Sequence, residues 1–442
     1  MYRLKNYNKI MDNYKRRIAD YLLEDLLEAC GCVLVEGSKW CGKTTTAEQA
    51  AKSIVYLADP EDGERNIQLA KTSPKFLLTG DTPRLIDEWQ VVPKLWDAIR
   101  FEVDHRRKQG QFIITGSAVP ASRDEIIHTG TGRIASLLMR PMSLWESGNS
   151  NGTISLGELF ESLPEQFTQR NDINIEKLAY LVCCGGWPTA ALSDNPKIAL
   201  KQAKIFYEGV VGKANGSGSD ISRADGVTRN PEFVKLLMRS LSRHQGAQVS
   251  ISTIYNDMIA NESSSLNEDT IFSYIRALKQ IFVIENMPAW NPNLRSKTAL
   301  RTSDTLYFVD PSIATAALRI SPSDLINDLN TFGLLFEALA VRDLRVFTDS
   351  LDGQVYHYRD KTGLECDAVV HLANGKYGLI EIKLGGDNLI EEGATTLKKL
   401  ASKIDTDRMR EPSFLMVLIG VGNYAYRRED GVIVVPLGCL KN

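Results

Sequence analysis

Residues 33–46 read VLVEGSKWCGKTTT, and this stretch decides how the rest of the chain is interpreted. Its apolar beginning predicts a short strand, its G-x-x-x-x-G-K-T segment predicts a loop, and the residues that follow favour a helix. Glycines permit a tight turn in which several N–H groups face inward. The helix adds its unpaired N-terminal amides and the positive end of its dipole. A chain of phosphates requires this combination.

We therefore expect the loop to bind the phosphates of a nucleotide. Lys43 is predicted to reach the β- and γ-phosphates, and Thr44 is predicted to coordinate Mg²⁺. The predicted phosphate-binding residues are Gly37, Ser38, Lys39, Trp40, Cys41, Gly42, Lys43, Thr44 and Thr45.

The composition is that of a globular protein with several domains. The chain has 442 residues, a net charge of −3 and seven cysteines with no C-x-x-C pair. The weak net charge means that any contact with nucleic acid must come from a local basic patch. Residues 1–17 carry no apolar run of a signal peptide, and no apolar run is long enough to span a bilayer. We expect a soluble, cytoplasmic protein with reduced thiols and no membrane partner.

Two acids follow an apolar pair in the segment RLIDEWQ, residues 84–90. Downstream of a phosphate loop, Asp87 at the end of a strand is expected to hold Mg²⁺, and Glu88 to orient and activate the attacking water. The alternative is a strand that ends in two solvated acids, and the phosphate loop favours the functional interpretation.

Two further segments offer groups for the same site. The buried strand predicted over 111–117 ends in Thr115 and Ser117, either of which could sense the γ-phosphate, or could belong to an ordinary turn. Arg133 follows Gly-x-Gly and could reach a phosphate across a subunit boundary, with Arg140 as a second candidate. Each arginine could equally be a surface residue paired with an acid.

The order of the predicted elements divides the chain into four units. Strands and helices alternate from 30 to 145, after an amphipathic helix over 14–30, which predicts a parallel sheet covered on both faces within domain 1–150. We expect a helical lid over 151–230, with a flexible segment at 213–219. The fourth unit covers 326–442.

The third unit, 231–325, is predicted to be a winged-helix domain. Two helices, over 250–259 and 266–279, precede a strand over 281–285. The second helix offers only Arg276 and Lys279 as cations, so packing or assembly is as well supported as DNA reading. Arg295, Lys297 and Arg301 could touch a phosphate backbone.

The fourth unit holds a second group of acids. Glu337 lies on a predicted helix, Asp367 on one strand, and Glu381 and Lys383 on one face of the next. Such a set predicts a metal-dependent site that cleaves phosphodiesters: Asp367 and Glu381 bind Mg²⁺, Glu337 completes the shell, and Lys383 stabilises charge or positions water. The alternative is a hairpin with solvated acids.

With these residues in view, nearly the whole chain resembles a family of prokaryotic ATPases. They join an AAA-like P-loop domain to a C-terminal domain of unknown function, of the DUF4143 type, that looks like the PD-(D/E)XK nuclease fold. The resemblance rests on residues 37–44, 86–88, 115–117, Arg133, 141–143, 185–188, Phe336-Glu337, Asp367 and Glu381-x-Lys383. Trp40 and Cys41 depart from the pattern because they add bulk to the phosphate loop.

The resemblance implies an α/β multidomain protein that binds and hydrolyses ATP with Mg²⁺. It also implies a homo-oligomer, for which a hexameric ring is one form, in which Arg133 acts in trans. Two hypotheses follow. In the first, ATP hydrolysis is coupled to DNA binding or processing, with branched or foreign DNA gripped or cut by the C-terminal unit. In the second, the protein is a nucleotide-dependent switch or assembly protein whose C-terminal unit only binds a partner.

Overall fold

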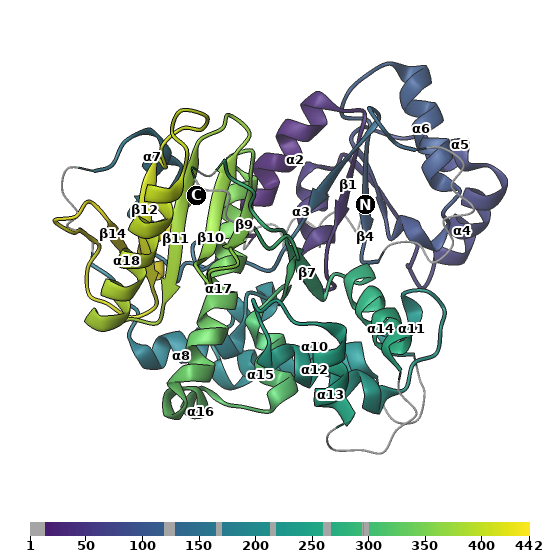
Figure 1. The fold of residues 1–442 in the computed structure, drawn as a ribbon. Helices are drawn as coiled ribbons and strands as arrows, with labels where there is room; N and C mark the ends of the chain where they lie inside the picture. The colour runs from purple at the N-terminus through teal and green to yellow at the C-terminus, as the bar shows by residue number, and fades with distance from the viewer. Residues whose placement is uncertain are drawn as a thin grey trace.

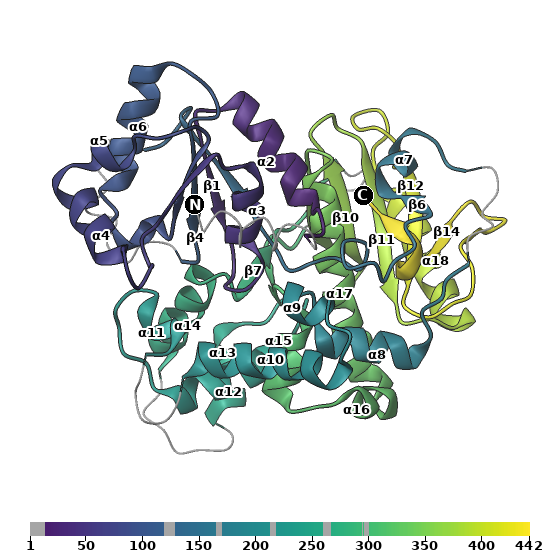
Figure 2. The same cartoon turned by 180° about the vertical axis from the view of Figure 1, so that it is seen from behind.

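The structure is a computed structural model that describes residues 14–118, 129–164, 170–212, 218–259, 267–293, 295 and 300–442. Residues 1–13, Lys297 and most of the predicted flexible segment at 213–219 lie outside the described residues. In Figures 1 and 2, an N-terminal α/β domain and a C-terminal α/β domain lie side by side above a helical middle region. No helix in the described ranges is both long enough and apolar enough to cross a membrane.

The N-terminal domain is built on five parallel strands in the order β2-β3-β4-β1-β5. The strands are β1 (Cys32–Glu36), β2 (Ser53–Tyr56), β3 (Arg84–Asp87), β4 (Phe112–Gly116) and β5 (Ile134–Leu138). The helices are α2 (Ile18–Ala29), α3 (Lys43–Ala50), α4 (Gly63–Thr72), α5 (Pro74–Leu77) and α6 (Leu95–Arg106), with a 3₁₀ turn η1 at Trp89–Val91.

Strand β1 shows why helices cover both faces of this sheet. Val33 and Val35 pack with residues of α2 and α3, whereas Cys32 and Leu34 pack with residues of α4, α5 and α6. Successive side chains of a strand point to opposite faces, so an apolar strand needs a cover on each side. The predicted parallel sheet with helices on both faces is confirmed.

The middle region is mainly helical. Its helices are α8 (Ile175–Cys184), α9 (Pro188–Ala191), α10 (Pro196–Val211), α11 (Asp220–Arg223), α12 (Pro231–Arg243), α13 (Ile251–Ile259), α14 (Glu268–Gln280), α15 (Pro311–Leu318) and α16 (Pro322–Asn327). Helix α10 packs on α8, α12 and α15, so helices of the expected lid and of the expected winged-helix unit share one core.

Helices α13 and α14 precede an antiparallel pair, β7 (Ile284–Met287) and β8 (Thr305–Phe308). Strand β7 begins three residues later than the strand expected over 281–285. Ile281 caps the end of α14, and Phe282 takes a left-handed backbone conformation with φ of 54°, so neither continues a strand. The order of elements is the expected one, and the winged-helix interpretation stays a prediction.

The C-terminal domain is a six-stranded mixed sheet in the order β13-β14-β12-β11-β10-β9. The strands are β9 (Gly353–Arg359), β10 (Glu365–Leu372), β11 (Tyr377–Lys383), β12 (Phe414–Ile419), β13 (Tyr426–Arg427) and β14 (Ile433–Pro436). Helix α17 (Leu329–Asp349) packs on one face and α18 (Asp387–Lys403) on the other. The short β15 (Leu440–Lys441) follows a 3₁₀ turn η2 (Leu437–Cys439) and pairs in parallel with β6 (Ile154–Ser155), next to α7 (Leu156–Glu161).

A buried group of charges joins the three regions. Arg342 on α17 forms ion pairs with Asp310 at 2.8 Å and with Asp343 at 2.7 Å. The N–H of Leu144 donates to Asp343, and the N–H of Gly186 donates to Asp310. A Cβ on Gly186 would lie 2.1 Å from the carbonyl oxygen of Met142, so only glycine allows this approach. The motifs at 141–143 and 185–188 therefore meet at a structural junction.

Candidate functional site

The loop between β1 and α3 depends on glycine at both ends. Gly37 has φ of +148° and Gly42 has φ of +104°. A Cβ on Gly37 would lie 2.1 Å from the carbonyl oxygen of Met139, which follows β5. The loop therefore turns tightly against the end of the neighbouring strand, as the sequence predicts.

The two bulky residues of the loop are accommodated outside it. Cys41 is buried in the core beneath α2, and its thiol donates to the carbonyl of Met139 at 3.3 Å. Trp40 is 50% exposed and meets the ring of Phe206 on α10 edge to face, with 6.1 Å between centroids. The core and α10 thus take up the bulk that seemed out of place in the sequence.

Two polar groups in the loop are suited to phosphate. The Lys43 ammonium is buried and donates to the carbonyl of Ser38 at 2.8 Å. The Ser38 hydroxyl is buried and has no hydrogen-bond partner among the described atoms. Helix α3 begins at Lys43, and the first N–H groups of a helix have no partner within it. A buried cation, an unpaired hydroxyl and a helix N-terminus fit a triphosphate.

Asp87 lies at the carboxyl end of β3 and receives two hydroxyl groups. Thr44 donates to its Oδ1 at 2.7 Å, and Thr115 donates to the same oxygen at 2.6 Å. The pairing of β3, β4 and β1 brings these ends to one edge of the sheet. Carboxylate and hydroxyl oxygens are ligands that Mg²⁺ prefers, so Asp87 and Thr44 fit the predicted role.

Glu88 stands beside this carboxylate in a left-handed backbone conformation, with φ of 59°. Its N–H donates to the Thr115 hydroxyl at 3.2 Å. Its Oε2 accepts from the Ser117 hydroxyl at 3.1 Å and from the side-chain amide of Gln90. A non-glycine residue in this region of backbone space is strained, and such strain gathers at functional sites. Gln90 was missed in the sequence, where its position two residues after Glu88 was the only signal.

A cavity of about 440 Å³ lies between this edge of the sheet and the middle region. Lys39, Glu88 and Ser117 line it from the N-terminal domain. Phe206 of α10 and Arg223 of α11 line it from the opposite side, and Lys39 forms a 2.5 Å ion pair with Asp220. Helices α10 and α11 thus cover the loop. Arg223 had no motif that would have revealed it in the sequence.

The two candidate finger arginines lie in different surroundings. Arg133 is 46% exposed, pairs with Asp104 at 2.9 Å, and precedes β5 at the edge of the sheet opposite the phosphate loop. The five residues of β5 separate it from that edge by about 16 Å. Arg140 lies on the phosphate-loop side, but its side chain is only 10% exposed and pairs with Glu285 and Asp349. Arg140 is therefore a junction residue in this structure, which favours the alternative of an arginine paired with acids over a finger.

The second group of acids sits where α17 meets β10 and β11. Lys383 lies 2.8 Å from Glu381 and 3.5 Å from Asp367. Glu381 is 3% exposed, and its Oε1 has no partner among the described atoms. Asp367 also accepts the N–H of Ile382 at 2.7 Å. The structure thus brings together the lysine and the two acids from adjacent strands, as predicted.

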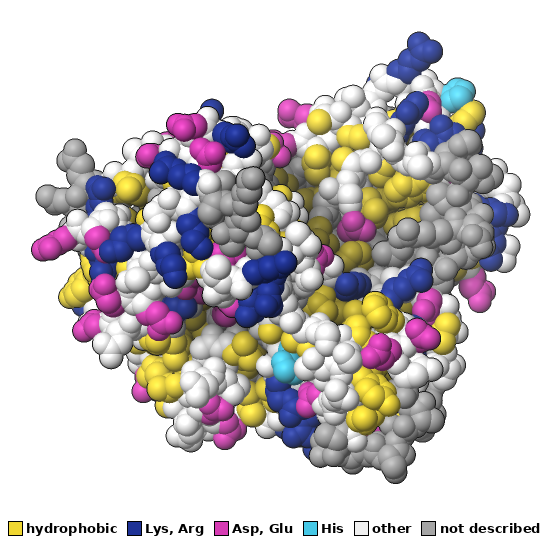
Figure 3. Space-filling view, in the orientation of Figure 1, with side chains coloured by type: hydrophobic (Ala, Val, Ile, Leu, Met, Phe, Trp, Pro, Cys, Tyr) yellow, Lys and Arg dark blue, Asp and Glu magenta, His cyan; other side chains and the backbone are white. Residues whose placement is uncertain are grey.

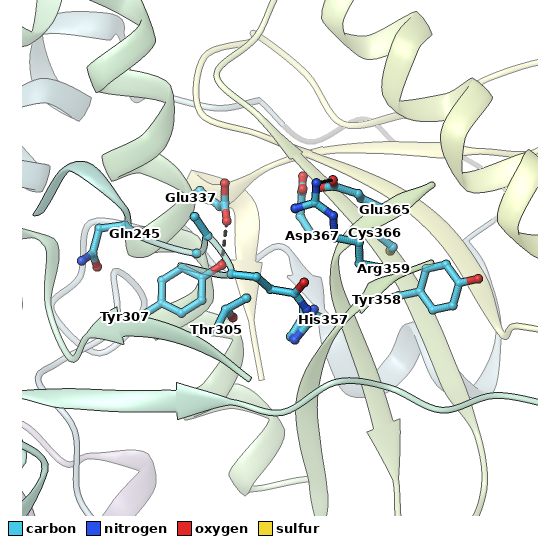
Figure 4. Close-up of a pocket in the computed structure, with 13 residues that line it drawn as sticks. Gln245, Thr305, Tyr307, Glu337, His357, Tyr358, Arg359, Glu365, Cys366 and Asp367 are labelled. Carbon is cyan, nitrogen blue, oxygen red and sulfur yellow. Dashed lines mark hydrogen bonds and ion pairs between the residues drawn. The ribbon is translucent and has the colours of Figure 1, made fainter. Parts of the chain in front are cut away.

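Glu337 is held by another part of the molecule. Tyr307 on β8 donates to its Oε1 at 2.6 Å. A Cβ on Gly246 would lie 2.4 Å from that oxygen, so the middle-region backbone packs directly on the carboxylate. Figure 4 shows Tyr307 aimed at Glu337 in a cavity of about 210 Å³ that Asp367, His357 and Gln245 also line. Tyr307 and Gly246 had no recognisable motif.

The pKa values of the ionisable side chains at this second site are strongly shifted. Burial, then the neighbouring Asp367 carboxylate, raises the pKa of Glu337 and that of Glu381 to about 8. Burial alone would lower the pKa of Lys383, but Asp367 and Glu381 raise it. Within the described ranges, no three His, Cys, Asp or Glu side chains form a group that could hold a metal ion. The described residues therefore do not show the predicted three-carboxylate shell: Glu337 accepts from Tyr307, and Lys383 lies beside Glu381 and Asp367. The metal role of these acids stays a prediction.

Comparison with protein families assigns three segments of the chain. Residues 31–147 match the model of an AAA domain, and residues 332–440 match a domain of unknown function, DUF4143. Residues 175–324 match another domain of unknown function, DUF8612. The chain carries an AAA-like ATPase domain followed, at its other end, by a DUF4143 domain. The resemblance stated from the sequence is confirmed for these two domains.

Similar proteins and structures are remote. The chain is 22% identical over 427 residues to uncharacterized proteins of Mycobacterium bovis and Mycobacterium tuberculosis, a match that covers 96% of this chain and 83% of each relative. The Walker-type ATPase PABY2304 of Pyrococcus abyssi is 15% identical, with a TM-score of 0.42, over 70% of this chain and 97% of that chain. The Aeropyrum pernix ORC1 protein in complex with DNA is 11% identical, with a TM-score of 0.24, over 70% of this chain and 93% of that chain.

Proposed function

We propose that the protein is an Mg²⁺-dependent ATPase. Lys43 and the loop at residues 37–45 bind the phosphates, and Thr44 and Asp87 would hold Mg²⁺. Bound Mg²⁺ would neutralise charge on the phosphate oxygens. Glu88, held by Ser117 and Gln90, orients the attacking water and accepts its proton. The Thr115 hydroxyl donates to Asp87 and accepts the backbone N–H of Glu88.

The convergence of Thr44 and Thr115 on one oxygen of Asp87 carries this proposal. It requires three separate segments of sequence to meet at one edge of the sheet, beside an unpaired hydroxyl and a buried lysine. Solvated acids at a strand end would not need these hydroxyl partners.

Phosphate release by the Glu88→Gln variant tests this assignment. Glutamine keeps the shape of the side chain but cannot accept the proton, so turnover should fall by about 100-fold or more while ATP affinity remains near that of the wild type. Glu64→Gln on α4 serves as the control for a lost exposed acid. Unchanged hydrolysis by Glu88→Gln, with ATP still bound, would show that another group activates the water.

Because Arg133 lies at the far edge of its own sheet, we propose that it acts only on a nucleotide of a neighbouring subunit. This role requires a homo-oligomer, such as a ring. The exposure of Arg133, and its pairing with one carboxylate, Asp104, among the residues that the structure describes, support a side chain that can exchange partners on assembly.

We propose further that ATP turnover is coupled to DNA through the C-terminal domain. The lysine between two acids on adjacent strands supports a site that engages phosphodiesters. On the face in Figure 3, however, Lys and Arg side chains of this domain are interspersed with Asp and Glu rather than gathered in one patch. Such a surface favours weak, locally directed contact with DNA over tight general binding.

The second candidate function is a nucleotide-dependent switch whose C-terminal domain only binds a partner. The hydrogen bond from Tyr307 to Glu337 and the absence of a three-carboxylate group in the described structure favour it. Incubation with linear, single-stranded and four-way DNA, with ATP and Mg²⁺, separates the candidates. DNA-stimulated phosphate release, or cleavage lost in Asp367→Ala and Lys383→Ala, supports the first. DNA-independent turnover without cleavage supports the second.

A further inference from the structure

The segment before α2 makes direct contact with the phosphate loop. Tyr14 and Arg17 lie outside the residues that match the AAA domain, which begin at 31. Arg17 is 4% exposed, although an isolated guanidinium strongly favours water. Its burial at this position therefore needs partners, and each partner found belongs to the N-terminal domain.

The donors of Arg17 bind two kinds of acceptor. Nε donates to Glu146 Oε1 at 2.8 Å, and Nη2 donates to Glu146 Oε2 at 3.2 Å. Nη1 donates to the carbonyl of Cys41 at 3.2 Å, and Nη2 also donates to the carbonyl of Arg140 at 3.1 Å. The planar guanidinium thus joins a carboxylate, the phosphate loop and the segment after β5.

Glu146 holds this guanidinium in one orientation. It accepts the N–H of Ile18 at 3.0 Å and the N–H of Ser143 at 2.8 Å. Burial would raise the pKa of Glu146, but Arg17 and these backbone donors bring it below its ordinary value. The carboxylate is therefore charged at neutral pH and bound from several directions.

The Cys41 carbonyl matters because of its place in the loop. In a trans peptide, the oxygen of Cys41 and the N–H of Gly42 point in opposite directions. Holding the oxygen on Arg17 therefore fixes the N–H of Gly42 on the other side, immediately before Lys43. Gly42 has no side chain to restrict its rotation, so this peptide needs support from outside.

We propose that Arg17 is a positioning residue for nucleotide binding, which orients the peptide between Cys41 and Gly42 from outside the loop. Tyr14 supports the same region, since its hydroxyl lies 2.7 Å from the Thr46 hydroxyl on α3 and donates to Asp20 at 2.8 Å. The inference rests on the proposed function, because it concerns the loop that would bind ATP.

A purely structural ion pair would have a different signature. Losing such a pair lowers the melting temperature but leaves the folded fraction with normal nucleotide affinity. A positioning residue changes the affinity of the folded protein itself. Binding must therefore be measured on protein shown to be folded, beside a control that loses a comparable ion pair elsewhere.

The test is calorimetric titration of the full chain with ADP and with ATP, at a temperature below unfolding. Arg17→Ala should weaken the affinity for ADP and the affinity for ATP by about tenfold or more. In steady-state phosphate release, it should raise KM more than it lowers kcat. The nucleotide affinity of Arg17→Lys should lie between that of Arg17→Ala and that of the wild type, because one ammonium cannot reproduce the planar guanidinium. Lys403→Ala, which leaves the buried Asp360 without its ion partner in the C-terminal domain, should keep wild-type affinity.

The outcomes are distinct. Wild-type affinity in folded Arg17→Ala overturns the inference. If Arg17→Ala does not fold, the decision passes to Arg17→Lys, for which an affinity loss of at least threefold is expected and unchanged affinity overturns the inference. Failure of the wild-type protein to bind ADP and ATP would instead overturn the proposed function.

Discussion

The acids at the end of β3 and the acids between β10 and β11 are treated differently by the fold. Asp87 receives hydroxyl groups from Thr44 and Thr115, and the buried Ser38 hydroxyl nearby has no partner within the described part of the chain. Glu337 is bound by a tyrosine, and Glu381 by a lysine. The first site is arranged around neutral donors that a ligand can replace. The second already balances its own charge.

The difference teaches how to weigh a cluster of acids. Neutral donors around a carboxylate keep its charge available for a cation, whereas an ammonium on the same carboxylate competes with that cation. A matching set of residue types is therefore weaker evidence for a metal site than the partners that each oxygen already has.

The largest effect is expected from removing the cation of the first site. Lys43→Ala should lower ATP affinity and phosphate release by about 100-fold or more, since a preorganised positive group at the phosphates is lost. The measurement is ATP titration with phosphate release, and Lys52→Ala, at an exposed lysine, is the control. Normal turnover in Lys43→Ala would remove the contrast between the two sites.

The second site is expected to make the folding stability of the protein depend on pH. Because the pKa values of Glu337 and Glu381 are raised to about 8, the folded state holds protons that the unfolded chain has released between about pH 4.5 and 8. The contribution of these groups to stability should therefore be fully present below about pH 4.5 and be lost as pH rises through 8, by at most about 5 kcal/mol for each carboxyl.

Glu337→Gln should remove part of this pH dependence, because glutamine stays neutral at every pH. Urea midpoints at pH 5 and pH 8 measure it, and Glu411→Gln, at an exposed acid, should keep the wild-type slope. If the urea midpoint changes equally between pH 5 and pH 8 in Glu337→Gln and in the wild type, the Glu337 carboxyl is not the source of the pH dependence.

The smallest effect is expected from a side chain that only orients the base. Gln90→Ala removes one of the two side-chain donors that Glu88 has among the described residues and leaves Ser117 in place. We expect kcat to fall by about fivefold, or about 1 kcal/mol, with KM unchanged. Steady-state kinetics beside Gln68→Ala, on the exposed surface of α4, gives the comparison. A change in KM alone would place Gln90 in nucleotide binding instead.

The N-terminal site was readable from sequence because its chemistry is local. Gly37, Lys43 and Thr44 lie within eight residues, and Asp87 ends an apolar strand, so strand order alone brings them to one edge. The sequence could not decide between the two interpretations of Arg140, because its two acids, Glu285 and Asp349, lie more than a hundred residues away. No local pattern reports such a partner.

The same limit explains the second site. The alternation of β11 correctly placed Glu381 and Lys383 together. The approach of Tyr307 and Gly246 to Glu337 depends on how the middle region packs on α17, which no periodicity encodes. Tertiary packing therefore decided what local pattern left open.

The pairing of β15 with β6 has a mechanical consequence. Leu440 lies beside Ile154, and the hydroxyl of Ser150 donates to the Leu440 carbonyl at 2.6 Å. The C-terminal domain is thus attached to the rest of the chain at two separate places, through α17 and through the pairing of β15 with β6. Two separated attachments leave the domain less freedom to move as a rigid body than one attachment would.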